Sequence, residues 1–127
     1  MDGPYLLDTS TMLWSLASPD RLSKAARAAL KAGPLVLSVV CYWEVVMKAQ
    51  QGLLRVADPV NWWGRATDLL GGDVLSVRAV HISALSGLPD LHKDPFDRML
   101  VAQAAADGLA IVTSDEHIRE YPVKTVW

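Results

Sequence analysis

The hydrophobic positions of this chain fall into short apolar runs, which alternate with longer stretches that have helical start and stop signals. The runs are bounded by Gly, Pro, Asp or Ser, and they contain few polar residues. Such runs are typical of strands buried on both faces, as in a parallel sheet. We predict strands over Tyr5–Asp8, Leu35–Ser38, Val74–Val77 and Leu109–Thr113, with Lys124–Trp127 as a candidate fifth.

Capping residues mark the helices between these runs. Ser23 is placed to cap a helix that Gly33-Pro34 ends, and Gly52 follows another helical stretch. Asp58-Pro59 and Asp94-Pro95 each combine a capping carboxylate with a proline at the first helical position. The predicted helices run from the Ser23 cap to Ala32, from Tyr42 to Gln51, from Pro59 to Leu70 and from Pro95 to Asp107.

The predicted order of elements is β-α-α-β-α-α-β-α-α-β-α-β, which indicates an α/β fold. We expect a three-layer α/β/α sandwich with a mainly parallel central sheet. Repeats, low-complexity segments and linkers are not evident, so residues 1–127 are expected to form a single domain. In such sheets, ligands bind at the carboxyl ends of the strands.

Composition narrows the class of protein. Hydrophobic residues make up 51% of the 127, which supports a core and excludes disorder. The apolar runs fall short of the roughly 18 residues of a membrane span, and MDGPYLLDTS lacks the features of a signal peptide. Cys41 is the single cysteine, which fits a reducing cytoplasm. The net charge of −2 means that nucleic acid binding would require a local basic patch.

Four acidic residues are predicted at one edge of the sheet. Asp8 and Asp115 each follow a predicted strand, whereas Glu44 and Asp97 lie in the first turns of helices. Carboxylates this close together repel one another, and a divalent cation bound by oxygen ligands would resolve the conflict. Each acid alone also has a structural interpretation: a helix cap for Asp8 and Asp115, capping with Asp94 for Asp97, and a surface pair with Lys48 for Glu44.

Four sequence pieces resemble the PIN domain, and in particular the VapC-type toxin ribonucleases of bacterial toxin–antitoxin pairs. The most specific piece is HKDPFDRMLVAQ, which covers residues 92–103. The others are LDTS at residues 7–10, SVVCYWE at 38–44 with Lys48 and Gly52-Leu53 after it, and VTSD at 112–115. The resemblance extends from Tyr5 to Val126.

The resemblance implies a metal site made of the same four acids, Asp8, Glu44, Asp97 and Asp115, in that order along the chain. It further implies Mg²⁺ or Mn²⁺ as cofactor, supporting hydroxyls from Thr9 and from Thr113 or Ser114, and an endoribonuclease that leaves a 5′-phosphate and a 3′-hydroxyl. Either Glu44 or Asp97 could accept the proton of the attacking water. Asp94 suits a helix cap better than a metal ligand.

The basic residues around this motif have structural interpretations. We expect His92 to hydrogen-bond and orient the segment from Asp94 to Arg98, and Arg98 to pair with Asp94 one turn away. His81 and His117 have no partners at metal-ligand spacing, and we interpret them as incidental.

The tryptophans suggest interaction surfaces. Trp43 is expected in the core, whereas Trp14, Trp62 and Trp63 cannot all face inward, and we expect at least one of them at an interface. The resemblance implies a homodimer and an antitoxin protein as partners, with RNA as substrate.

The alternative is a catalytically silent binding module of the same fold. A dehalogenase-type phosphatase is disfavoured because Ser10 stands where it needs a second Asp, and a phosphorelay receiver because Asp8 lacks an acidic neighbour.

Overall fold

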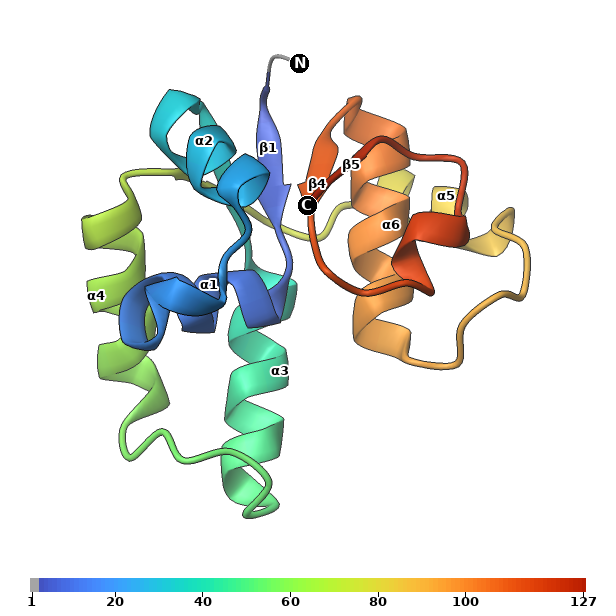
Figure 1. Cartoon of the computed structure of the whole chain (residues 1–127). Helices are drawn as coiled ribbons and strands as arrows, with labels where there is room; N and C mark the ends of the chain where they lie inside the picture. The colour runs from blue at the N-terminus through green and yellow to red at the C-terminus, as the bar shows by residue number, and fades with distance from the viewer. Residues whose placement is uncertain (1–2) are drawn as a thin grey trace.

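The computed structural model describes residues 3–127 and contains a five-stranded sheet (Figure 1). The strand order is β3-β2-β1-β4-β5, and all four pairings are parallel. Each predicted strand is present, which confirms the parallel α/β architecture. The strands are β1 (Tyr5–Leu7), β2 (Leu35–Ser38), β3 (Asp73–Leu75), β4 (Ala110–Val112) and β5 (Thr125–Val126).

Six helices flank the sheet. Figure 1 shows α5 and α6 to the right of the strands, α1 and α4 to the left, and α3 extending below β1. Within residues 3–127, no helix is long and apolar enough to cross a membrane. The helices are α1 (Thr9–Ala17), α2 (Lys24–Ala32), α3 (Val39–Gln50), α4 (Pro59–Leu70), α5 (Ala79–Ser86) and α6 (Pro95–Asp107), with 3₁₀ turns at Pro19–Arg21 and Ile118–Glu120.

The capping residues read from the sequence set most helix boundaries. Ser23, Asp58 and Asp94 each accept a hydrogen bond from a backbone N–H in the first turn of α2, α4 and α6. The start of α3 differs from the prediction. It begins at Val39, three residues before Tyr42, because the Ser38 side chain accepts from the Val40 N–H and caps the helix directly at the strand end.

The core forms where the helices meet the sheet, around fully buried residues such as Leu6, Leu37 and Ile111. The prediction that Trp43 belongs to this core is wrong, since 55% of its surface is exposed. Cys41 and Val45 turn α3 toward the sheet, and Trp43 therefore points away from it. Its ring instead lies edge-on to Phe96, with 4.7 Å between centroids.

A buried polar network joins α6 to two other elements. Ser38 Oγ donates to Gln103 Oε1 (2.6 Å), and Gln103 Nε2 donates to the Ser76 carbonyl (3.3 Å). His81 is fully buried beside Gln103, and its Nε2 lies 3.1 Å from Asp107. The interpretation of His81 as incidental is therefore wrong. Its Nδ1 accepts from the Arg78 N–H and fixes the start of α5.

Gln103→Leu is expected to lower the free energy of unfolding by about 2–3 kcal/mol, because the buried Ser38 hydroxyl loses its acceptor and the Ser76 carbonyl loses its side-chain donor. Urea denaturation measures the change. Gln50→Leu, at an exposed position at the end of α3, is the matched control. A loss at Gln103 no larger than at Gln50 would contradict this role.

Candidate active site

The structure brings the four predicted acids to one cavity of about 270 Å³ at the carboxyl edge of the sheet. Asp8 follows β1, Glu44 lies in the second turn of α3, Asp97 lies in the first turn of α6, and Asp115 follows β4. β1 lies between β2 and β4, so the elements that carry the acids are adjacent. The cavity is lined by Asp8, Thr9, Ser10, Glu44, Lys48, His92, Asp94, Asp97, Ser114 and Asp115.

Asp8 is buried, and both of its carboxylate oxygens are held. Oδ1 accepts from the Thr11 N–H (2.9 Å), which makes Asp8 the N-cap of α1. Oδ2 accepts a short hydrogen bond from the Thr113 hydroxyl. Burial raises the pKa of Asp8 despite these hydrogen bonds. The capping interpretation and the site interpretation are therefore compatible for this residue.

Glu44 is also buried, which excludes its interpretation as one half of a purely solvated helical pair. Thr9 Oγ1 donates to Glu44 Oε1 (2.6 Å), so the predicted supporting hydroxyl contacts an acid of the site. Lys48 Nζ lies 2.6 Å from Glu44 Oε2, one helical turn further along α3. This contact raises the pKa of Lys48 and keeps its ammonium charged.

Asp97 lies between a histidine and a helix cap. Its Oδ2 is 3.0 Å from His92 Nε2, while Asp94 accepts from the Phe96 and Asp97 N–H groups. Burial, followed by the charges of Asp94, Glu44, Asp115 and Asp8, raises the pKa of Asp97 to about 8. Asp94 is thus the cap of α6, as predicted, and His92 contacts the segment that it was predicted to orient.

Asp115 organises the turn after β4. Its N–H donates to Thr113 Oγ1 (3.0 Å), and its Oδ1 accepts from the N–H groups of His117 and Ile118. Its other oxygen lies 3.8 Å from His92 Nε2. Of the two hydroxyls predicted as alternatives, that of Thr113 donates to Asp8, whereas Ser114 lines the cavity and has no described hydrogen bond to an acid. Asp115 thus has a capping role, as its structural interpretation predicts, although the element that follows it is the short 3₁₀ turn at Ile118–Glu120 and not an α-helix.

The donor set fits a divalent cation with a preference for oxygen. Four carboxylates converge on one cavity lined by a single lysine among the described residues, and burial together with the neighbouring acids raises the pKa values of Asp8 and Asp97, so their charged forms are unfavourable unless a cation is bound. His92, Asp97 and Asp115 each offer a ligand atom within 4.8 Å of the others. Carboxylate sites of this kind suit Mg²⁺ and Mn²⁺.

Two details of the site differ from the prediction. Arg98 does not pair with Asp94: its Nη1 donates to the Pro89 carbonyl (2.9 Å) and to the Tyr121 hydroxyl (3.0 Å). The reason is that Asp94 points into the first turn of α6 as its cap. The sequence reasoning also missed the proximity of His92 to Asp115, because that contact depends on the turn after β4.

Residues 5–124 match the PIN domain family. The chain is 33% identical to Ribonuclease VapC22 of Mycobacterium tuberculosis over 96% of its own length and 97% of that protein. In structure it is similar to VapBC2 from Rickettsia felis bound to a DNA fragment from their promoter, with a TM-score of 0.69 at 14% identity and coverage of 95% and 96% of the two chains. FitAcB from Neisseria gonorrhoeae has a TM-score of 0.61 at 17% identity, with 95% of each chain covered.

The chain therefore belongs to the PIN domain family, whose match covers nearly all of it. The relative at 33% identity is a ribonuclease by name. The two structural neighbours establish the shared fold.

Proposed function

We propose that this protein is a metal-dependent endoribonuclease and the toxin of a toxin–antitoxin pair. The observation that carries the proposal is the convergence of Asp8, Glu44, Asp97 and Asp115 on one cavity. Membership of the PIN domain family and the relation to Ribonuclease VapC22 support it. An RNA substrate would place this activity in the cytoplasm.

Asp8, Glu44 and Asp97 would hold Mg²⁺ or Mn²⁺, with Asp115 at the margin because it is the most exposed of the four acids. A divalent cation held there would lower the pKa of a water molecule and offset negative charge on the scissile phosphate. Thr9 and Thr113 fix the carboxylates of Glu44 and Asp8 through hydrogen bonds. His92 holds Asp97, since its Nδ1 faces the Asp94 N–H and its Nε2 is left to donate to that carboxylate.

The reaction would hydrolyse an RNA phosphodiester and leave a 5′-phosphate and a 3′-hydroxyl. Asp97 is the better-placed proton acceptor of the two that the sequence left open. Both Glu44 oxygens are engaged by Thr9 and Lys48, whereas His92 contacts only the Oδ2 atom of Asp97.

We expect wild-type protein stripped with EDTA to bind Mn²⁺, and Asp8→Asn and Asp97→Asn each to weaken that binding by at least tenfold. Calorimetry measures the binding. A ligand at ten times its dissociation constant stabilises the fold by about 1.4 kcal/mol, so a melting shift should accompany it. Asp68→Asn, an exposed change on α4, is the control. If millimolar Mn²⁺ does not bind, the nuclease proposal fails and a silent binding module is left.

The antitoxin would occupy an apolar groove of about 550 Å³ between α1, α4 and the segment that precedes α4. Trp14 and Trp62 line this groove, which supports an interface role for these two tryptophans. Trp63 lies next to Trp62 but stacks on Tyr42 at 5.0 Å, which gives it a supporting position.

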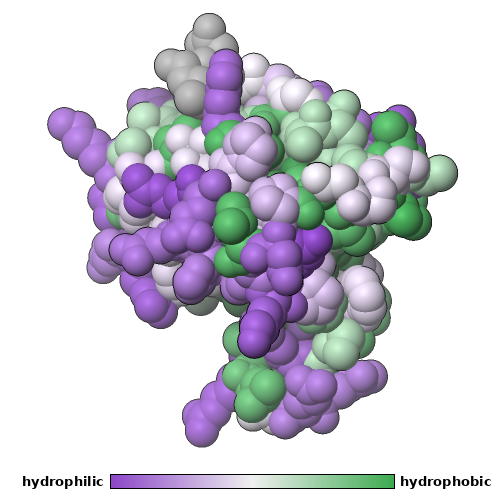
Figure 2. Space-filling view, turned by 90° about the vertical axis from the view of Figure 1, so that its right-hand side faces the viewer, coloured by the Kyte–Doolittle hydropathy of each residue, from purple (hydrophilic) through white to green (hydrophobic). Residues whose placement is uncertain are grey.

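The homodimer would form on a second apolar surface, around the edge strand β3 and helix α5. Val74, Val80 and Ile82 are each about half exposed there, and hydrophobic residues are visible along the right-hand side of the molecule in Figure 2. Ile82→Glu is expected to convert the dimer to a monomer in sedimentation, because it buries an unpaired charge. A dimer that survives this change would place the contact elsewhere.

A further inference from the structure

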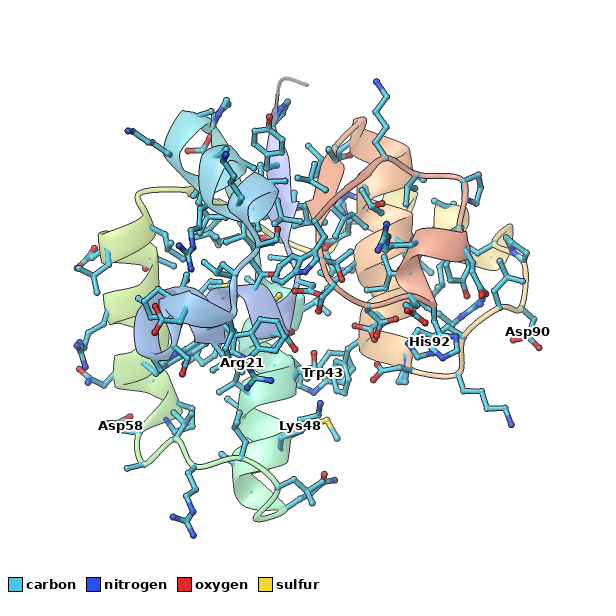
Figure 3. All side chains as sticks on the ribbon, in the orientation of Figure 1. Arg21, Trp43, Lys48, Asp58, Asp90 and His92 are labelled. Carbon is cyan, nitrogen blue, oxygen red and sulfur yellow. The ribbon has the colours of Figure 1, made fainter. Side chains whose placement is uncertain are left out.

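Lys48 is the only lysine or arginine that lines the acidic cavity in the described part of the chain. It reaches the cavity from α3, and Figure 3 shows Lys48 on this helix below the strands, with His92 across from it on the loop before α6. Its Nζ contacts Glu44 at 2.6 Å, yet 42% of its side chain is exposed. The ammonium therefore contacts both a buried acid and solvent.

With this contact, each carboxylate oxygen of Glu44 has a partner within the protein. Oε1 already accepts from the Thr9 hydroxyl, and Oε2 faces Lys48 Nζ. A cation that approaches Glu44 must therefore compete with the ammonium for Oε2. Since the side chain of Lys48 is flexible and partly exposed, the ammonium can leave Glu44 without unfolding α3.

We propose that Lys48 is a substrate-binding residue of this site, which neutralises Glu44 while the site lacks a divalent cation and contacts an RNA phosphate once the cation is bound. The inference rests on the proposed function and deepens it. A lysine is a mobile point charge that can bind either a carboxylate or a phosphate oxygen. The transfer of the Lys48 ammonium from Glu44 to a phosphate would raise the affinity for RNA only when the divalent cation is bound.

The first test is metal affinity, compared in wild-type protein, Lys48→Met and Lys31→Met. Lys31 is a matched control because it too is a lysine in the last turn of a helix, and α2 ends where β2 begins, away from the cavity. Calorimetry with Mn²⁺ alone should show that Lys48→Met binds roughly three- to tenfold more tightly than wild type, since the competing charge is gone. Lys31→Met should match wild type.

The second test is binding of a single-stranded RNA of random sequence, shown by gel to remain intact, with Mn²⁺ and with EDTA. In Mn²⁺, Lys48→Met should weaken RNA binding about tenfold. It should also reduce the magnitude of the slope of log affinity against log salt concentration by about one, which corresponds to the loss of one phosphate contact. In EDTA the same change should have no more effect than Lys31→Met, because Lys48 is held by Glu44.

The two measurements together decide the proposal. A weaker affinity of Lys48→Met for Mn²⁺ would overturn it, since Lys48 would then organise Glu44 for the metal. An equal loss of RNA binding with and without Mn²⁺, or no loss in either, would also overturn it. If the wild-type protein does not bind Mn²⁺, the proposed function itself fails, which is a distinct result.

Discussion

Asp97→Asn is expected to stabilise the metal-free protein while it weakens metal binding. The pKa of Asp97 is raised to about 8 by burial and by four neighbouring acids, so its charged form is unfavourable in the fold. Asparagine keeps an oxygen that can accept from His92 but carries no charge. We expect the free energy of unfolding in EDTA at pH 8 to rise by about 1–3 kcal/mol, a value discounted for partial exposure.

The pH dependence of this gain in the free energy of unfolding distinguishes an electrostatic cause from a change in packing. Between the unfolded pKa near 4 and the folded value of about 8, the native protein retains a proton that the unfolded chain has lost. Stability contributed by that proton is present at low pH and is lost as pH rises toward 8. Asp97→Asn should therefore show little gain at pH 4 and its full gain at pH 8. A gain that does not change with pH would contradict the electrostatic explanation.

Affinity for Mn²⁺ is expected to rise roughly tenfold per pH unit between pH 6 and pH 8 and to level off above that range. The metal binds the carboxylate form of Asp97, and with a pKa of about 8 this group must lose its proton first. Calorimetry in buffers of different ionisation enthalpy should detect the release of close to one proton per ion at pH 7. An affinity that is constant over this range would show that Asp97 is already ionised or is not a ligand.

Most of the fold could be predicted because its signals are local. The Asp58-Pro59 and Asp94-Pro95 pairs start α4 and α6 at the predicted residues, and Gly71 and Gly108 end them in the left-handed conformation that glycine tolerates. Where a side chain faces was harder to predict. Trp43 is exposed because Cys41, Glu44 and Val45 lie on the buried side of α3. That a residue is apolar does not by itself show which side of its helix is buried.

Part of the candidate site could also be predicted, because the signals for that part are local in the sequence. The end of a strand is visible in sequence, and parallel strands place their ends at one edge, so Asp8 and Asp115 could be assigned to a common site. Contacts made across elements were not visible. The pairing of Arg98 with Tyr121 depends on the path of the chain after β4. The burial of His81 depends on how α5 packs against α6.

The order of the acids along the chain has a consequence for synthesis of the protein. β1 carries Asp8 and pairs with β4, and Asp115 follows β4 more than a hundred residues later. A nascent chain in which β4 has not yet been synthesised lacks both Asp115 and Thr113, whose hydroxyl donates the hydrogen bond that holds Asp8. The complete acidic cluster can therefore form only after β4 and Asp115 have been synthesised.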